Sequence, residues 1–374
     1  MNKGHLRLIA EYLPREDVQA ITTLLKKNLI TVTYEQLRTT IVRPKTYPQL
    51  QAKQSDGKLE NKLRSYNTFI EERFYQKVFR EFSSVAFEKI NYFFERTGFK
   101  KKEITNALIL SLFAKNPTHL LLLGDPEQGQ NELLSSVSTL SPIGVIADLK
   151  EIPESHLYMK TINKKREPGC IAEAHDGILI LKHLQFKSDA ATHTFAKALD
   201  TGKTTFKRGK AEVHVTSNFS CIATSYPDSF HFVGKRISFL HGQLMFPQTL
   251  LQDFSLVFLL RRSPQQEFFR EKNFYSLNMH TQDINDPDIE FVRKYIEYAR
   301  EHTIDFAQLL KAEVADFVES LMGKKEYFIE PNKNTIKGII NLAKARAALH
   351  LRKDVTTDDL EFVFSIVKES AISF

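Results

Sequence analysis

The sequence contains no tryptophan, only two cysteines and no long uninterrupted hydrophobic run. Charged residues interrupt each apolar stretch before it reaches the roughly 20 residues that a transmembrane helix requires. Cys170 and Cys221 lack the paired spacing of a zinc site and are too few for a disulfide framework. No secretory hydrophobic segment follows the N-terminus. We therefore expect an intracellular chain, cytoplasmic or associated with the nucleoid or nucleus, with no membrane partner.

The composition that is present is ordinary for a globular protein, apart from an excess of phenylalanine. The 374 residues are enough for two or three domains, and 42% of them are hydrophobic and 26% charged. We expect the 29 phenylalanines to fill the core. The net charge of +7 and the pI of about 9.1 permit nucleic-acid binding but do not demonstrate it.

The spacing of apolar residues divides the chain into four parts. They are a small helical unit with a polar linker at 1–60, a helical linker at 61–117, an α/β core at 118–262 and a helical lid at 263–374.

The first part has helical apolar spacing over residues 5–27, and no strand pattern is evident in it. A short extended piece at 30–33 is expected to lead into a helix through Leu37 and Ile41. Periodicity leaves open whether these elements are a fragment of a winged helix or another three-helix cap.

Short apolar runs alternate with helical segments from Thr118 onward, which is typical of an α/β layered domain. Such runs suit strands of a parallel sheet that is buried on both faces. The expected strands are 120–123, 144–146, 178–181, 220–224 and 256–260. After residue 262 the pattern becomes helical, and Thr356 with Asp359 resembles a capping box that opens the last helix.

A strand, a loop with two glycines and a helix follow one another with the spacing of a phosphate-binding loop. From Gly124 the loop reads Gly-Asp-Pro-Glu-Gln-Gly-Gln-Asn, against the pattern G-x-x-x-x-G-K-[ST]. Gln130 occupies the slot of the phosphate-binding lysine, and Asn131 occupies the slot of the metal-binding hydroxyl. Glu127 adds a carboxylate to a loop whose N–H groups should face an anion. The strand, loop and helix with two glycines indicate a nucleotide site. The residues Glu127, Gln130 and Asn131 argue against nucleotide chemistry there.

The order of motifs over residues 100–374 resembles the AAA+ ATPase core of the MCM replicative helicases. The matching segments are a helix at 103–113, Gly124-Asp125-Pro126, a strand at 176–181, the stretch 250–258, and the lid sequences 341–347 and 355–359. The resemblance implies an α/β fold, with an AAA+ αβα core around a parallel five-stranded sheet and a helical C-terminal lid. The small helical unit would precede it, in place of the family's oligonucleotide-binding barrel and zinc ribbon.

The residues that carry catalysis in the family are replaced in this chain. The replacements are Gln130 and Asn131 in the loop, Lys182 and His183 after the Walker B strand, Tyr226 at sensor 1, Asp253 at the arginine finger and Asn334 at sensor 2. Phosphoryl transfer depends on positioning and electrostatics, and a lysine has no lone pair to offer Mg²⁺. We therefore expect a degenerate site, made of Gly124, Glu127, Gly129 and these seven positions, with no catalytic residue and no cofactor.

Two basic turns are candidates for contact with DNA. Residues 203–215 read as strand, turn and strand, at the place of a family hairpin that points basic side chains at DNA. The candidate residues are Lys207, Arg208 and Lys210 in this hairpin, and Lys164, Lys165 and Arg166 in a second turn. Such side chains can contact phosphates. The alternative is that both turns are simply solvated.

We interpret the chain as a catalytically inactive MCM-like protein that acts as a DNA-associated or regulatory scaffold in DNA replication or repair. Its partners would be non-specific DNA and an active MCM subunit or another replication protein. The alternatives are a nucleotide-binding switch that does not hydrolyse, and a cryptic ATPase or helicase subunit. The oligomeric state stays open, but Asp253 and Glu127 would meet across a ring interface, so no nucleotide-driven homohexamer is expected.

Overall fold

The computed structural model of the protein describes most of the chain. The described residues are 3–54, 56–124, 129–163, 165–186, 188–208, 211–227, 232, 240–260, 286–323 and 328–371. They fall into two compact units, one made of residues 1–86 and 284–291, the other of 87–283 and 292–374. No helix in the described ranges has the length and apolar character needed to cross a bilayer.

The first unit combines helices with a β-hairpin. Its elements are α1 (Lys3–Ile9), α2 (Arg15–Lys26), β1 (Ile30–Gln36), β2 (Thr46–Ala52) and α3 (Gly57–Phe82). The two strands are antiparallel and pair from Ile30 with Ala52 to Gln36 with Thr46. Tyr47 of β2 stacks on Phe74 of α3, with 4.5 Å between the ring centroids.

This hairpin corrects the sequence-based description of the first sixty residues. The predicted helix through Leu37 and Ile41 is wrong, because these residues follow β1 in an irregular connection. Residues 46–52 form a strand inside the predicted polar linker, so the statement that no strand pattern is present is also wrong. The β-branched run that starts at Ile30 favours a strand. Its polar side chains concealed it, because most of β1 is exposed beyond Ile30.

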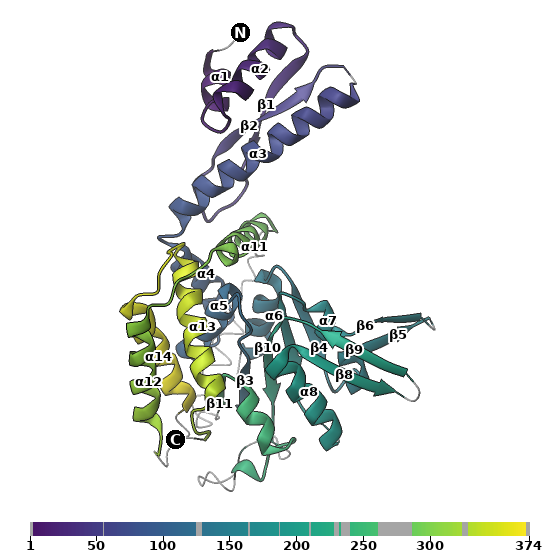
Figure 1. Cartoon of the computed structure of the whole chain (residues 1–374), viewed down its shortest axis with the longest axis vertical. Coiled ribbons are helices and arrows are strands. Elements are labelled where there is room, and N and C mark those ends of the chain that lie inside the picture. The colour runs from purple at the N-terminus through teal and green to yellow at the C-terminus, as the bar shows by residue number, and fades with distance from the viewer. Residues whose placement is uncertain are drawn as a thin grey trace. The chain divides into compact units, whose positions relative to one another are not determined.

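The second unit is built on a five-stranded parallel sheet, as predicted (Figure 1). In spatial order the strands are β11 (Leu256–Leu260), β3 (Leu120–Gly124), β10 (Ser220–Ser225), β7 (Ile178–Lys182) and β4 (Gly144–Asp148). All four pairings between neighbours are parallel. The interior strands β3 and β10 are buried along their whole length, which explains the continuous apolar run of β3. In β10 the buried Ser220, Thr224 and Ser225 flank an apolar centre.

Helices and two hairpins complete the layers around the sheet. The helices are α4 (Ala86–Glu95), α5 (Lys102–Phe113), α6 (Gln130–Leu140), α7 (Cys170–Glu173) and α8 (Asp189–Thr201), with short 3-10 turns η1 (Glu154–Leu157) and η2 (Gln248–Asp253). The hairpins are β5 (Met159–Ile162) with β6 (Lys165–Pro168), and β8 (Lys203–Arg208) with β9 (Ala211–Thr216). The predicted strand, turn and strand over 203–215 is therefore confirmed.

The C-terminal part is helical, as expected for a lid. Its helices are α11 (Asp286–Glu301), α12 (Gln308–Leu321), α13 (Lys333–Leu349) and α14 (Thr357–Ala371). Thr356 donates its backbone N–H to the Asp359 carboxylate at 2.9 Å, which is half of the predicted capping box. Our division of the chain at residues 60, 117 and 262 stays a prediction.

Candidate functional site

Both glycines of the phosphate-loop pattern have a structural reason to be glycine. Gly124 ends β3 with φ +128°, and a β-carbon there would collide with the carbonyl of Leu260 on β11. Gly129 caps α6 with φ +76°, and a β-carbon there would collide with the backbone at Thr97. Glycine is thus required by backbone conformation and close packing at both positions. Glu127 lies outside the described residues.

The first turn of α6 has a glutamine, Gln130, where the phosphate-loop pattern places a lysine. Gln130 is the first residue of the helix and only 3% of its surface is exposed. Asn131, in the hydroxyl slot, is exposed. The amino end of a helix still favours an anion. A neutral buried amide at Gln130, however, cannot supply the charge that a phosphate-binding lysine provides.

The carboxyl end of β7 holds a histidine–carboxylate pair that sequence reasoning missed. Lys182 is the last residue of β7, and His183 follows with φ +56°. Nδ1 of His183 lies 2.7 Å from Oδ1 of Asp148, and the same oxygen accepts the backbone N–H of Lys150 at 2.9 Å. Asp148 pairs with Lys182 in the strand register, so it stands beside the Walker B position. A carboxylate is thus present here, but it comes from β4 and is engaged by His183.

Tyr226 and Thr224 complete this end of the site. The Thr224 hydroxyl accepts the backbone N–H of His183 at 3.3 Å, and the rings of His183 and Tyr226 have centroids 5.3 Å apart. Burial raises the pKa of the Tyr226 hydroxyl, and the charge of Asp148 adds to the rise. A cavity of about 120 Å³ opens beside these side chains. Among the described residues, no three His, Cys, Asp or Glu side chains converge as metal ligands.

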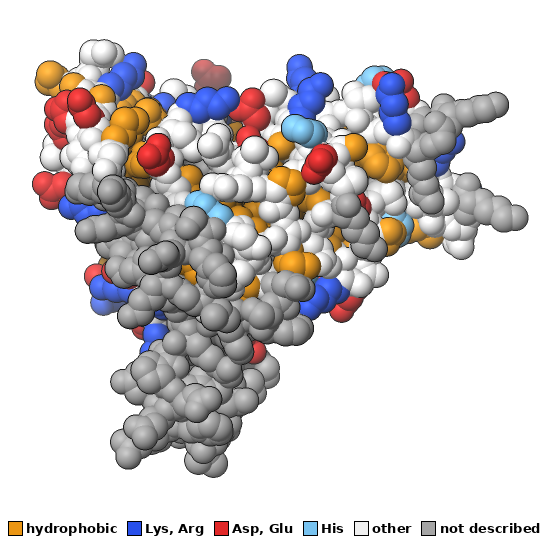
Figure 2. All heavy atoms as spheres, turned by 90° about the horizontal axis from the view of Figure 1, so that it is seen from below, with side chains coloured by type: hydrophobic (Ala, Val, Ile, Leu, Met, Phe, Trp, Pro, Cys, Tyr) orange, Lys and Arg blue, Asp and Glu red, His pale blue; other side chains and the backbone are white. Residues whose placement is uncertain are grey.

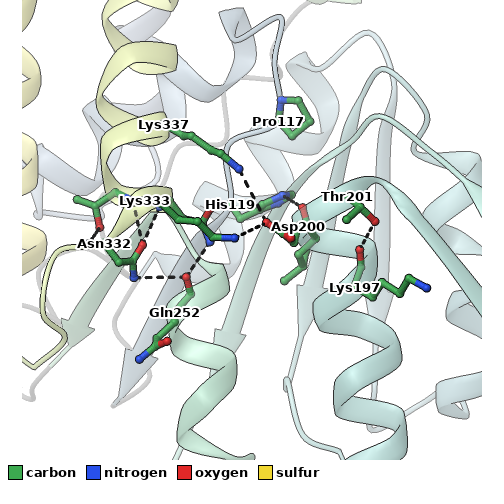
Figure 3. Close-up of polar contacts among 12 residues, drawn as sticks. Pro117, His119, Lys197, Asp200, Thr201, Gln252, Asn332, Lys333 and Lys337 are labelled. Atoms are coloured by element: carbon green, nitrogen blue, oxygen red, sulfur yellow. Dashed lines mark hydrogen bonds and ion pairs between the residues drawn. The ribbon is translucent and has the colours of Figure 1, made fainter. Parts of the chain in front are cut away.

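The residues predicted at the arginine-finger and sensor 2 positions, Asp253 and Asn334, lie close together in another part of the same unit. Asn334 is 6% exposed in the first turn of α13, and its side-chain amide donates to the carbonyl of Gln252 at 2.8 Å. Asn332, the N-cap of α13, donates to the same carbonyl at 3.4 Å (Figure 3). Gln252 precedes Asp253, so the lid helix is tied to η2 beside the finger position. The residue predicted at sensor 2, Asn334, therefore makes its hydrogen bond within this chain.

Asp253 borders a cavity of about 490 Å³ at the edge of the sheet where β3, β10 and β11 begin. Burial and the nearby Asp200 carboxylate raise the pKa of Asp253 to about 6, while Lys333 and His193 oppose the rise. Asp200 is itself approached by the ammonium groups of Lys333 at 3.2 Å and Lys337 at 3.8 Å (Figure 3). The position predicted for the arginine finger thus holds a half-buried acid.

His119, which also lines this cavity, is a structural residue. Its Nε2 lies 3.0 Å from the Leu199 carbonyl, and its Nδ1 accepts the backbone N–H of Cys221 at 3.1 Å. These contacts fix a neutral ring with the proton on Nε2, and burial lowers the pKa of His119 to about 4. The ring joins β3, α8 and β10 and has no ring nitrogen left for chemistry. The sequence offered no signal for this role, because both partners are backbone atoms of distant elements.

The two basic hairpins lie next to one another. Figure 1 shows them projecting from the same side of the α/β unit, and Tyr158 at the base of one stacks on Phe206 of the other at 4.8 Å. The Lys207 side chain is 74% exposed and lies 4.0 Å from Glu212. Lys165 and Arg166 are exposed on β6. The Arg208 side chain, Lys164 and Lys210 lie outside the described residues. The hairpins are confirmed, and their contact with DNA stays a prediction.

A model of the MCM P-loop domain matches residues 97–280. This chain belongs to the MCM family. It is 24% identical over 292 residues to the minichromosome maintenance protein MCM of Saccharolobus solfataricus, which is 71% of this chain and 42% of that protein. It is also 24% identical to the DNA replication licensing factor MCM4 of Drosophila melanogaster, over 68% of this chain and 31% of the relative. With the DNA helicase MCM8 of Xenopus tropicalis the identity is again 24%, over 68% and 36%.

The MCM match spans less than half the length of each of these relatives. The family model covers residues 97–280, and this range includes the loop, strand β7 and the positions predicted for sensor 1 and the arginine finger. The residues that match the MCM family therefore include most of the candidate site residues described above. Lys182, His183 and Asp253, which the sequence predicts at the Walker B and arginine-finger positions, lie within the matched residues.

Proposed function

We propose that this MCM-family chain acts in DNA replication or repair as a subunit that does not hydrolyse ATP and serves as a DNA-associated or regulatory module. A role in DNA replication or repair is supported by the names of two relatives, a DNA replication licensing factor and a DNA helicase. Its partners would be non-specific DNA and an active MCM subunit or another replication protein.

The observation that carries the proposal is the contact between His183 and Asp148. Mg²⁺ is held by oxygen ligands, and carboxylates are the usual ones in nucleotide sites. Lys182 cannot ligate a cation, and Asp148 would have to leave His183 and the Lys150 N–H to do so. The residues that would hold the metal are thus either replaced or already bonded within the chain, and the site does not fit a bound Mg²⁺.

The residues at the predicted arginine-finger and sensor 2 positions support the same function. In the family these residues act on the nucleotide of a neighbouring subunit. Asp253 carries the opposite charge from an arginine, and Asn334 is buried against Gln252. An arginine finger is worth about 10³–10⁵ in rate, so its replacement by an acid would also silence a neighbour's site.

A second candidate function is a nucleotide-binding switch without hydrolysis. It is favoured by the retained glycines, by the amino end of α6, and by Lys182, whose charge could offset part of a phosphate's charge in the absence of Mg²⁺. The two functions differ in one property, because a switch must bind nucleotide and a scaffold need not.

Thermal unfolding with and without ATP separates these functions. A ligand that binds the folded state raises the melting temperature by mass action. For the scaffold we expect no shift with ATP at millimolar concentration, with or without Mg²⁺. A shift that needs Mg²⁺ would contradict the proposal. A shift with ATP alone that disappears in Lys182→Ala would establish the switch.

A further inference from the structure

A second cavity, of about 210 Å³, lies between the end of α5, the end of α11 and the middle of α13. Its apolar wall is made by Phe113, Ala299, Ile304, Ala345 and Ala348, and its polar lining by Lys115, Asn116, Arg300, His302, Thr303, Asn341 and Lys344. None of these residues belongs to the loop between Gly124 and Gly129. None of them is among the ten positions of the predicted nucleotide site, although Asn116 and Asn341 also line the cavity that Asp253 borders.

The charged side chains of this cavity all have one sign. Lys115, Arg300 and Lys344 line it, and no Asp or Glu is among its described lining residues. Within the described part of the chain, none of the three makes an ion pair or a side-chain hydrogen bond. Burial lowers the pKa of Arg300, and the carboxylates of Asp176 and Glu297 oppose this only from beyond ion-pair distance.

Arg300 and Lys344 are partly buried and Lys115 is exposed, so water still reaches all three side chains. A partly buried guanidinium without a hydrogen-bonded partner in the protein loses part of its hydration, and a bound anion would replace what is lost. The ends of α5 and α11 explain part of the pattern, because basic side chains are favoured at the carboxyl ends of helices. They do not explain Lys344, which lies in the interior of α13, or the absence of a lining carboxylate.

We propose that this cavity binds a phosphate group. A guanidinium can hold two phosphate oxygens at once, and the two ammonium groups add point charges. The volume is below the roughly 300–1,000 Å³ of pockets for drug-sized ligands, so it suits one phosphate with a small attached group and not a whole nucleotide. The phosphate belongs either to a nucleic-acid backbone or to a free small phosphate. The proposal does not depend on whether the chain binds ATP.

The test measures binding of inorganic phosphate and pyrophosphate by calorimetry, and of a fluorescent single-stranded oligonucleotide by anisotropy. The variants are Arg300→Gln and Lys344→Gln, and the matched control is Lys311→Gln, an exposed lysine of α12 outside the cavity. We expect each cavity variant to weaken binding about tenfold or more, as for removal of a hydrogen bond between charged groups, and the control to bind as the wild type does.

If the cavity variants weaken binding of the oligonucleotide only, the ligand is a nucleic-acid phosphate. If they also weaken binding of inorganic phosphate or pyrophosphate, the ligand is a free phosphate. Both outcomes support the site. Lys344→Gln replaces a side chain that is only partly buried, so it keeps the test decisive if Arg300→Gln does not fold. The proposal is overturned if no phosphate ligand binds, or if the cavity variants and Lys311→Gln bind all three ligands equally.

Discussion

At the scale of single residues, Asp359 shows how an acid can be wholly buried in the lid. Its carboxylate has no exposed surface. It accepts hydrogen bonds from Arg346 at 2.9 Å, from the two Nη atoms of Arg352 at 2.6 and 2.7 Å, and from the Thr356 N–H. Burial alone would raise the pKa of Asp359, but the bonds from Arg352 and Thr356 and the charge of Arg352 outweigh it and lower the pKa.

We predict that Asp359→Asn lowers the free energy of unfolding by about 3 kcal/mol at neutral pH, because two guanidinium groups are left without their buried partner. Since the folded pKa lies below the unfolded value of about 3.9, the stabilisation is complete above pH 4 and disappears as pH falls further. Urea titrations of both proteins from pH 7 to pH 3 measure it. A difference between them that is constant over this range would contradict the prediction.

The residues that sequence reasoning could not place are those whose partners come from distant elements. Gln130 was assigned from the spacing of the phosphate-loop pattern, and Lys182 and Asp253 were assigned from the resemblance to MCM motifs. The engagement of Asp148 by His183 depends on β4 lying beside β7, and strand order cannot be read from a sequence. This limit is physical, because a periodic pattern reports which face of an element is buried and not which element covers it.

At the scale of elements, the start of α13 is fastened to the core by polar contacts. Asn332 and Asn334 donate to Gln252, while Lys333 and Lys337 face Asp200 (Figure 3). The five strands of the sheet were predictable because each is a short segment with an apolar centre, bounded by turns or helices. The hairpin of β1 and β2 was not, because its exposed polar side chains hide the apolar alternation.

We predict that Asn334→Arg, which introduces the residue type expected at sensor 2, destabilises the protein by about 2 kcal/mol and does not create ATPase activity. An arginine cannot occupy the buried place of Asn334 without giving up hydration or moving the helix. Chemical denaturation measures the change, and Lys333→Arg, at a position 69% exposed, is the matched control. Equal stability of the two variants would show that α13 is not held by this contact.

The hairpins should give weak, salt-sensitive and sequence-independent binding to single-stranded DNA. The test variant replaces Lys207, Arg208 and Lys210 with alanine, and the charge-matched control replaces Lys26, Lys27 and Lys58. We expect the hairpin variant to weaken binding and to reduce the slope of log affinity against log salt by about 0.7 for each phosphate that the protein no longer neutralises. Anisotropy titrations at several salt concentrations measure both. Equal slopes for the two triple variants would remove the hairpin from the DNA interface.

At the scale of the whole molecule, no broad basic surface is visible on the face shown in Figure 2. Lys and Arg side chains are interspersed there with Asp and Glu among the described residues. The net charge of +7 is therefore not gathered into one patch on that face. This distribution supports local contacts with DNA through the hairpins more than a wide electrostatic footprint.

Assembly of the chain into a ring would depend on the charges that meet at the subunit interface. In a ring of the family's kind, Asp253 would approach the neighbour's phosphate loop, which carries Glu127. Since the pKa of Asp253 is about 6, its carboxylate is mostly ionised at pH 7.5 and repels both that carboxylate and bound phosphate. We predict the same mass by light scattering with and without Mg-ATP. A hexamer that forms only when Mg-ATP is added would contradict this prediction.

The central claim, that the chain does not hydrolyse ATP, is tested most directly by release of labelled phosphate from ATP. The assay uses Mg²⁺, single-stranded DNA and protein in excess over nucleotide, so that even one slow turnover is seen. Gln130→Ala and Lys182→Ala, purified in parallel, report any contaminating ATPase. We predict a rate that is indistinguishable among the three proteins and from the contaminant background. A rate in the wild type that either substitution abolishes would contradict the claim.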